Sequence, residues 1–156
     1  MARRKPKLKK DGTPRAKPKW NPNSAFRGAL RRVFARSPQV KAVKDRARKE
    51  EPKYNKDGSV SKKPRVLFQC AECKGWFKGT HVAVDHIDPV INPETGYVDW
   101  NTFIERLDCH EDNLQVVCSY TKTHEDKKKE YGRYSCHYYK TQEERKALKA
   151  LKDAKK

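Results

Sequence analysis

The chain is poor in hydrophobic residues and has no long apolar stretch. Only 35% of its 156 residues are hydrophobic, against about 45–50% in an average globular domain. It contains no run of about 18 apolar residues, the length that a membrane-spanning helix needs. No apolar stretch follows the basic N-terminal region, so the pattern of a signal peptide is missing too. We therefore expect a small packed core, no membrane partner and a cytoplasmic protein.

Acidic residues are scarce relative to basic ones. Asp and Glu number 20 against 38 Lys and Arg, which gives a formal net charge of +18. An excess of this size indicates a polyanionic partner. We expect double-stranded DNA and no small-molecule substrate, while the sequence leaves open whether the protein is a monomer or a dimer.

The five cysteines are an odd number in a chain without export signals. That combination favours metal binding over a disulfide framework. Cys70 and Cys73 are separated by two residues, and two thiolates at this spacing can chelate one tetrahedral zinc ion at about 2.3 Å each.

The front of the chain divides into an arm and two helices. Residues 1–20, with nine Lys or Arg between positions 2 and 19, are predicted to be a disordered basic arm that tracks phosphates, or simply a solubilising tail. Residues 21–52 are predicted to be a basic helical DNA-binding segment. We expect one helix over 25–36, capped by Asn23 or Ser24, and a second from Pro38 to about Glu50. The basic face of the first helix carries the expected nucleic-acid ligands, Arg27, Arg31, Arg32 and Arg36.

A polar segment, 53–64, is predicted to be a linker or hairpin. Residues 65–156 then form the predicted metal-bearing domain. We expect a strand over 65–69, the Cys70–Cys73 turn, and a return strand from Trp76 toward Asp85. A short helix capped by Asp99 should cover the sheet, and a terminal helix should carry Ala147, Leu148 and Leu151 on one side.

Asp85 and His86 close a stretch in which Val82 and Val84 alternate as in a half-buried strand. Neighbouring strand residues face opposite sides, so at least one of Asp85 and His86 must face a cleft or water. A carboxylate supplies a hard oxygen ligand for a divalent cation, and an imidazole supplies a base with an ordinary pKa of about 6.5. The pair can hydrolyse a phosphodiester, although an isolated Asp-His dipeptide is more often ordinary surface or capping chemistry.

Five spaced elements together resemble the HNH endonuclease family, in particular its phage-type free-standing or homing members. They are Cys70-x2-Cys73, Val84-Asp85-His86-Ile87-x-Pro89, Asp112-Asn113-Leu114-Gln115, Cys118, and Cys136-His137-x2-Lys140-Thr141. The resemblance covers about residues 25–145, and all five elements occur in the family's order.

The resemblance implies an α+β protein with a small ββα-metal fold and a structural zinc site. It implies a metal-dependent DNA endonuclease that acts in the cytoplasm, that of the bacterial host if a phage encodes it. His86 would be the general base, and Asn113 would pin the loop that orients it. Asp85 and His137 would hold a catalytic Mg²⁺ or Mn²⁺, and Lys140 is assigned to nucleic-acid binding. The implied zinc ligands are Cys70, Cys73, Cys118 and Cys136.

The chain departs from the family pattern after Cys118, where residues 119–135 appear as an inserted loop. Cys136 is the expected fourth zinc ligand, with His124 and Cys109 as the alternatives. The competing function is a non-catalytic zinc-ribbon nucleic-acid-binding protein, which the charge and the cysteines explain equally well. That function leaves Asp85, His86 and His137 unexplained. The sequence does not give the DNA target, or whether one or both strands are cut.

Overall fold

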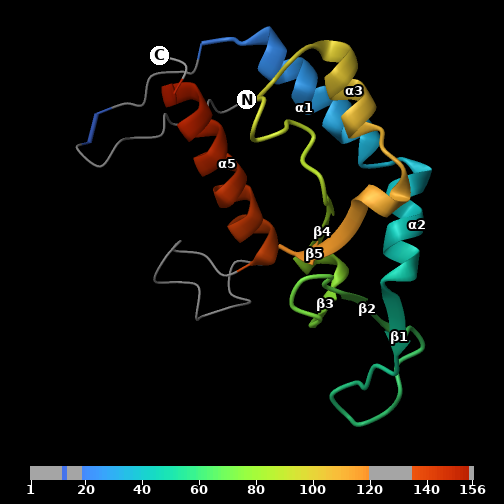
Figure 1. Ribbon diagram of the computed structural model, residues 1–156. Coiled ribbons are helices and arrows are strands. Elements are labelled where there is room, and N and C mark those ends of the chain that lie inside the picture. Colours follow the sequence, from blue (N-terminus) through green and yellow to red (C-terminus); the bar gives the residue numbers. More distant parts are fainter. Residues whose placement is uncertain (1–11, 14–18, 120–134, 155–156) are drawn as a thin grey trace, which may run out of the picture.

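A computed structural model of the protein describes residues 12–13, 19–119 and 135–154. These residues form an α+β fold. The α-helices are α1 (Pro22–Phe34), α2 (Pro38–Arg46), α3 (Trp100–Leu107) and α5 (Cys136–Ala154). One antiparallel sheet contains β1 (Arg48–Glu51), β2 (Arg65–Gln69) and β3 (Trp76–Lys78), and the other contains β4 (Val82–His86) and β5 (Leu114–Cys118) (Figure 1).

The first helix starts and ends earlier than predicted. Asn21, rather than Asn23 or Ser24, caps α1, because its side-chain oxygen accepts a hydrogen bond from the Ser24 amide at 3.1 Å. Pro22 then takes the first helical position, where its missing N–H costs no hydrogen bond. The helix ends at Phe34 instead of residue 36. The predicted start of the second helix is confirmed, since Ser37 caps α2 at Pro38.

The second helix ends at Arg46, so the prediction that it reaches Glu50 was wrong. Residues 48–51 are instead the edge strand β1, paired with β2 from Arg48 opposite Phe68 to Glu51 opposite Arg65. The stretch has no apolar residue to extend the buried face of α2, and its backbone gains a hydrogen-bonded partner in β2.

The segment 53–64 is a hairpin loop that connects the paired strands β1 and β2. The Asn55 amide donates to the Ser59 carbonyl at 2.8 Å, and Gly58 takes a φ of +82°, a conformation that favours glycine. The segment therefore does not separate two independent parts of the chain.

The predicted return strand from Trp76 toward Asp85 is two strands in different sheets. β3 pairs with β2, a short 3-10 turn (Gly79–His81) follows, and β4 pairs with β5. The register of the second pair runs from Val82 opposite Cys118 to His86 opposite Leu114. With α5, which follows β5 along the chain and contacts it, this pair makes a unit of two strands and one helix.

The front helices share a core with this unit. Val40 and Val43 of α2 are buried together with Leu114 and Val116 of β5. The predicted Asp99 cap of α3 is confirmed by a 2.8 Å bond from the Thr102 amide. However, α3 packs mainly against α1 rather than over a sheet, as Figure 1 shows. In addition, α2 contacts β4, and Phe34 at the end of α1 packs against His86 at the end of β4.

The terminal helix α5 partly buries two of the three apolar residues that were predicted to lie on one side of it. Leu148 and Leu151 are half-buried, whereas Ala147 is exposed. None of the helices among the described residues is long and apolar enough to cross a membrane.

A candidate metal centre and the pocket beside it

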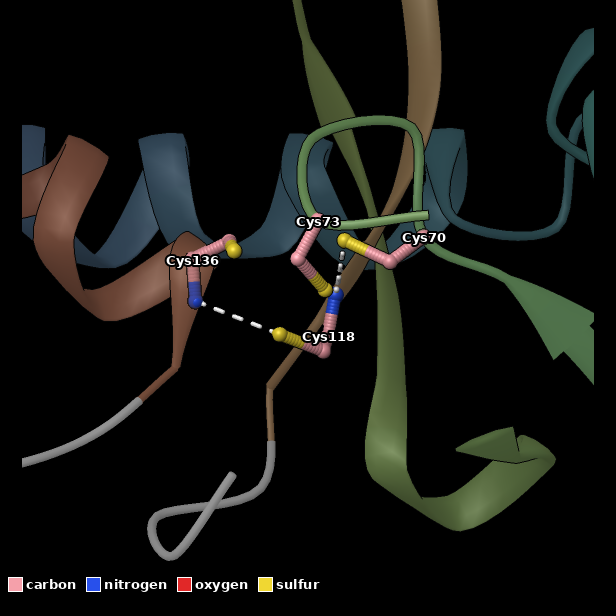
Figure 2. Close-up of side chains that lie close together, drawn as sticks. All are labelled: Cys70, Cys73, Cys118 and Cys136. Carbon is pink, nitrogen blue, oxygen red and sulfur yellow. Dashed lines mark hydrogen bonds between the residues drawn. The ribbon is translucent and has the colours of Figure 1, made fainter. Parts of the chain in front are cut away.

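Four cysteines converge at one point of the structure. The Sγ atoms of Cys70, Cys73, Cys118 and Cys136 all lie within 4.8 Å of one another, and three of the residues are buried (Figure 2). A tetrahedral zinc site with Zn–S bonds of 2.3 Å would place sulfur atoms about 3.8 Å apart, so a small contraction of the cluster fits the ion. The four thiols can hold a metal such as zinc.

The turn after β2 presents the first two cysteines. The Cys70 amide donates to the Gly75 carbonyl and the Lys74 amide donates to the Cys70 carbonyl, both at 2.9 Å. Lys74 takes a φ of +58°. A Cβ atom on Gly75 would lie 2.8 Å from Cζ of Phe77, closer than any side chain allows. A larger residue at position 75 would therefore have to displace the ring of Phe77.

The other two cysteines come from the end of β5 and the start of α5. Ser135 is buried and caps α5, because its hydroxyl accepts a hydrogen bond from the Tyr138 amide at 3.3 Å. Backbone amides also reach the sulfur atoms. The Cys118 amide donates to Sγ of Cys70, and the Cys136 amide donates to Sγ of Cys118, each at 3.3 Å. These bonds stabilise negative charge on sulfur.

The thiols titrate very differently from one another. The hydrogen bond from the Cys118 thiol lowers the pKa of Cys70 to about 4. That same bond, which holds the Cys118 proton, and then burial raise the pKa of Cys118 far above its ordinary range. Burial raises the pKa of Cys136 to about 12. Without a cation the cluster therefore favours a single thiolate, and a divalent cation supplies the charge that lets the other thiols ionise.

The fourth position of the cluster is occupied by Cys136. Cys109 lies outside the cluster, where it packs against the Val40 and Val43 core, and burial raises its pKa. His124 and the inserted loop, apart from residues 119 and 135, lie outside the described residues. Among the described residues, only these four cysteines form a group of three or more potential metal ligands.

A separate pocket lies where α1, α2, β4 and the start of α5 meet. It is an open cavity of about 300 Å³, and Asp85, His86 and His137 all line it. The structure thus brings together three residues that are up to 52 positions apart in the sequence. The wall formed by the front helices contributes Arg31, Phe34 and Lys44.

His86 is held in a defined orientation. Its Nε2 lies 3.0 Å from the carbonyl oxygen of Leu107. A carbonyl oxygen only accepts hydrogen bonds, so Nε2 must carry the proton, and Nδ1 of the neutral ring is left with a free lone pair. Burial lowers the pKa of His86, and the Leu107 carbonyl and Asp85 offset only part of that effect. His86 is therefore a neutral imidazole at physiological pH.

The loop after His86 is tied down by Asn113 and Arg106. The Ile87 amide donates to the Asn113 carbonyl, and the Asp88 amide donates to the side-chain oxygen of Asn113, both at 2.8 Å. The Arg106 guanidinium donates to the Pro89 carbonyl through two nitrogens, at 3.1 and 2.8 Å. These bonds fix the backbone that leaves β4.

Asp85 is paired with a lysine on α5. Nζ of Lys140 lies 3.1 Å from a carboxylate oxygen of Asp85 and 3.9 Å from Glu144, and it donates to the carbonyls of His86 and Ile87. Lys140, which we expected to bind nucleic acid, is therefore engaged within the protein. Burial and then repulsion from Asp85 raise the pKa of Glu144. No hydrogen bond or ion pair of the His137 side chain to another described residue is present.

The four basic residues assigned to the first helix lie in different surroundings. Arg27 stacks on Tyr97, with its guanidinium carbon 5.5 Å from the ring centroid. Arg31 and Arg32 on α1 and Arg36 after it are all exposed. Arg31 alone reaches the pocket that contains His86.

Sequence reasoning missed several residues that build the site. Leu107 acts through its backbone carbonyl, which has no sequence signal. Phe34, Lys44 and Glu144 have no local sequence signal that places them at the pocket. Ser135 was detectable, because a serine immediately before a helix is a common cap.

Comparisons with protein-family models, with curated proteins and with solved structures found no match to this chain. Its function must be inferred from the pocket, the cysteine cluster and the sequence motifs.

Proposed function

We propose that the protein is a metal-dependent DNA endonuclease that hydrolyses phosphodiester bonds in the pocket formed by α1, α2, β4 and α5. The observation that carries the proposal is the state of His86, a neutral imidazole fixed by the Leu107 carbonyl in the same pocket as Asp85 and His137. The resemblance to HNH endonucleases and the +18 charge both support a nucleic-acid substrate.

His86 has the properties of a general base. With Nε2 occupied by Leu107, Nδ1 of the neutral ring can take a proton from a water molecule that attacks phosphorus. The bond to the 3′ oxygen then breaks with its electron pair on that oxygen, which takes a proton from solvent water, so the products are a 5′-phosphate and a 3′-hydroxyl. Asn113 and Arg106 hold the backbone of the following loop, and we assign them the role of keeping the ring in place.

Asp85 and His137 are the proposed ligands of the catalytic cation. The carboxylate of Asp85 is a hard oxygen donor, and His137 offers an imidazole without a protein partner among the described residues. Two protein ligands suffice for Mg²⁺, which usually keeps several of its waters. The cation would offset the charge that develops on the phosphate oxygens. The Lys140 ammonium, 3.1 Å from one carboxylate oxygen of Asp85, would compete with a cation for this ligand.

The cysteine cluster has a structural role in this proposal. Four thiolates leave a zinc ion no open coordination position. Cys136 is adjacent to His137, and it begins α5 at the cluster. Zinc bound there would fix the start of α5 and, with it, the position of His137 beside β4.

One observation favours the alternative, a non-catalytic zinc-containing nucleic-acid binder. The Lys140 ammonium already neutralises the Asp85 carboxylate at 3.1 Å, so Asp85 needs no cation in order to be satisfied. On that account the acidic residue and the lysine would be a structural ion pair that ties α5 to β4.

A nicking assay separates the two functions. Zinc-loaded protein is incubated with supercoiled plasmid in Mg²⁺ or Mn²⁺, in EDTA, and in EDTA followed by excess Mg²⁺. We expect nicked circles with either cation, none in EDTA, and recovery when Mg²⁺ is restored. Plasmid binding without nicking under every condition, by protein that retains its zinc, would establish the non-catalytic alternative.

A further inference from the structure

Two basic side chains from the front helices face the proposed reaction pocket. Arg31 on α1 and Lys44 on α2 line the cavity whose other wall contains Asp85, His86 and His137. Although both helices precede the metal-bearing motifs in the chain, α2 packs against β4 and β5. The front helices are therefore part of the pocket rather than a separate DNA-binding attachment.

Neither of these cations is held in a salt bridge within the described part of the chain. No ion pair or side-chain hydrogen bond joins Arg31 or Lys44 to another described residue. Lys140, on the α5 side, is by contrast paired with Asp85 and Glu144. Two unpaired positive charges at a concave site favour an anionic ligand.

Arg31 is held in place by its surroundings. Its guanidinium carbon lies 5.8 Å from the centroid of the Phe103 ring, which limits where the side chain can point. Burial lowers the pKa of Arg31, against the opposing influence of the Asp85 carboxylate. Arg31 is exposed at the rim of the pocket, and an arginine stays protonated at any working pH, so the pocket carries a permanent positive charge that a substrate can reach.

We propose that Arg31 and Lys44 bind two phosphates of the substrate's phosphodiester backbone. The inference rests on the proposed function, because it names the group that each residue binds in the same pocket. Arg31, which lines the pocket with Asp85 and His86, binds the phosphate that reacts. Lys44 binds a neighbouring phosphate of the same strand.

The chemistry of the two side chains suits this division. The planar guanidinium of Arg31 can donate two parallel hydrogen bonds to one phosphate and can follow the charge that develops there during attack. The ammonium of Lys44 is a point charge on a flexible stem, which suits affinity more than catalysis.

The test compares Arg31→Met and Lys44→Met with the matched control Lys41→Met. Methionine keeps the aliphatic stem and removes one charge in each variant. Lys41 is exposed on the same helix as Lys44 and does not line the pocket. Zinc content and thermal unfolding show that each variant is folded, and Arg31→Lys serves as a second variant if Arg31→Met is not.

Two readouts are measured on the full chain. The first is kcat and KM for nicking of supercoiled plasmid in Mg²⁺. The second is the shift of the His86 and His137 imidazole resonances when a 12-base-pair duplex is added in Ca²⁺, which does not require cleavage. We expect Arg31→Met to lower kcat by about 10²–10³-fold and to remove the resonance shifts. We expect Lys44→Met to raise KM and to lower the log–log salt slope of duplex binding by about 0.9, and Lys41→Met to match wild type in both readouts within about twofold.

The outcomes separate this inference from the proposed function. If Arg31→Met behaves like Lys41→Met in both readouts, or if duplex binding leaves the wild-type His86 and His137 resonances unmoved, the proposed phosphate binding by Arg31 is wrong even in an active enzyme. If the duplex shifts those resonances only when Arg31 is present and no nicking occurs, phosphate binding by Arg31 is supported and the proposed hydrolytic function is wrong.

Discussion

The ring of Phe34 packs against the imidazole of His86, with the ring centroids 5.3 Å apart and the planes tilted by 31°. Phe34 ends α1, and His86 ends β4. This contact is how a helix from the front of the chain buries the proposed general base and lowers its pKa.

The lowered pKa of His86 makes stability and base function depend on pH in a defined direction. Burial depresses the folded-state pKa below the ordinary value of 6.5, so the unfolded chain binds the proton more tightly. The contribution of His86 to the free energy of unfolding is therefore fully present above pH 6.5, and it is lost as the pH falls from 6.5 toward the folded-state pKa. An NMR titration of His86 should give a midpoint below 6.5.

Removing the Phe34 ring should reverse the shift in the pKa of His86. We expect Phe34→Ala to raise the His86 midpoint toward 6.5, because the imidazolium becomes easier to hydrate. Phe26→Ala is the matched control, since Phe26 lies on the same helix and is 60% exposed. Equal midpoints in the two variants would show that Phe34 does not bury the base.

Cys136 should be required for zinc, whereas Cys109 should not. We expect Cys136→Ser to weaken zinc binding by more than the about 10–100-fold that follows loss of a supporting hydrogen bond, and to lower thermal stability because metal binding contributes to folding. Cys109→Ser should keep one zinc per chain. Metal analysis after dialysis against a chelator gives the answer, and a Cys136→Ser protein with full zinc would exclude Cys136 as the fourth ligand.

Lys140 should compete with the proposed catalytic cation for Asp85. Removing an ammonium 3.1 Å from Asp85 frees a carboxylate, and a partly exposed ion pair is worth about 0.2–1 kcal/mol. We therefore expect Lys140→Met to tighten Mn²⁺ binding by about two- to fivefold, measured by electron paramagnetic resonance. Lys146→Met is the control on the same helix, where Lys146 pairs with exposed Glu143. Weaker Mn²⁺ binding in Lys140→Met would mean that Lys140 supports the site.

The basic arm should contribute to DNA affinity through phosphate contacts. Most of residues 2–19 lie outside the described residues, so the prediction rests on their charge. Each phosphate contact adds about −0.9 to the log–log salt slope of binding, and deletion of the arm should flatten the slope accordingly. A salt titration that gives the same slope with and without residues 2–19 would make the arm a solubilising tail.

The parts of the fold that the sequence predicted correctly have local signals. The Cys70–Cys73 turn, the strand β4 and the Asp99 cap each depend on residues a few positions apart. Strand β1 has no such signal. Arg48–Glu51 is highly charged and becomes a strand only because β2 lies beside it, a pairing that periodicity within one segment does not reveal.

The candidate site likewise has parts with a local sequence signal and parts without one. Motif spacing identified the four cysteines, and the structure brings them together. The contacts that define the chemistry of the pocket are long-range, such as His86 with the Leu107 carbonyl and Asp85 with Lys140. A backbone acceptor leaves no trace in side-chain identity, and the ion pair depends on how α5 packs beside β4.

The most direct test of the account is cleavage by wild type and His86→Ala under identical conditions. Supercoiled plasmid is incubated with each zinc-loaded protein in Mg²⁺, and the nicked product is treated with DNA ligase. We predict that wild type produces nicks that ligase reseals, because hydrolysis leaves a 5′-phosphate and a 3′-hydroxyl. We predict that His86→Ala retains zinc and duplex affinity but nicks about 10²–10⁴-fold more slowly, the usual cost of losing a general base. A folded His86→Ala protein that nicks at the wild-type rate would contradict the account.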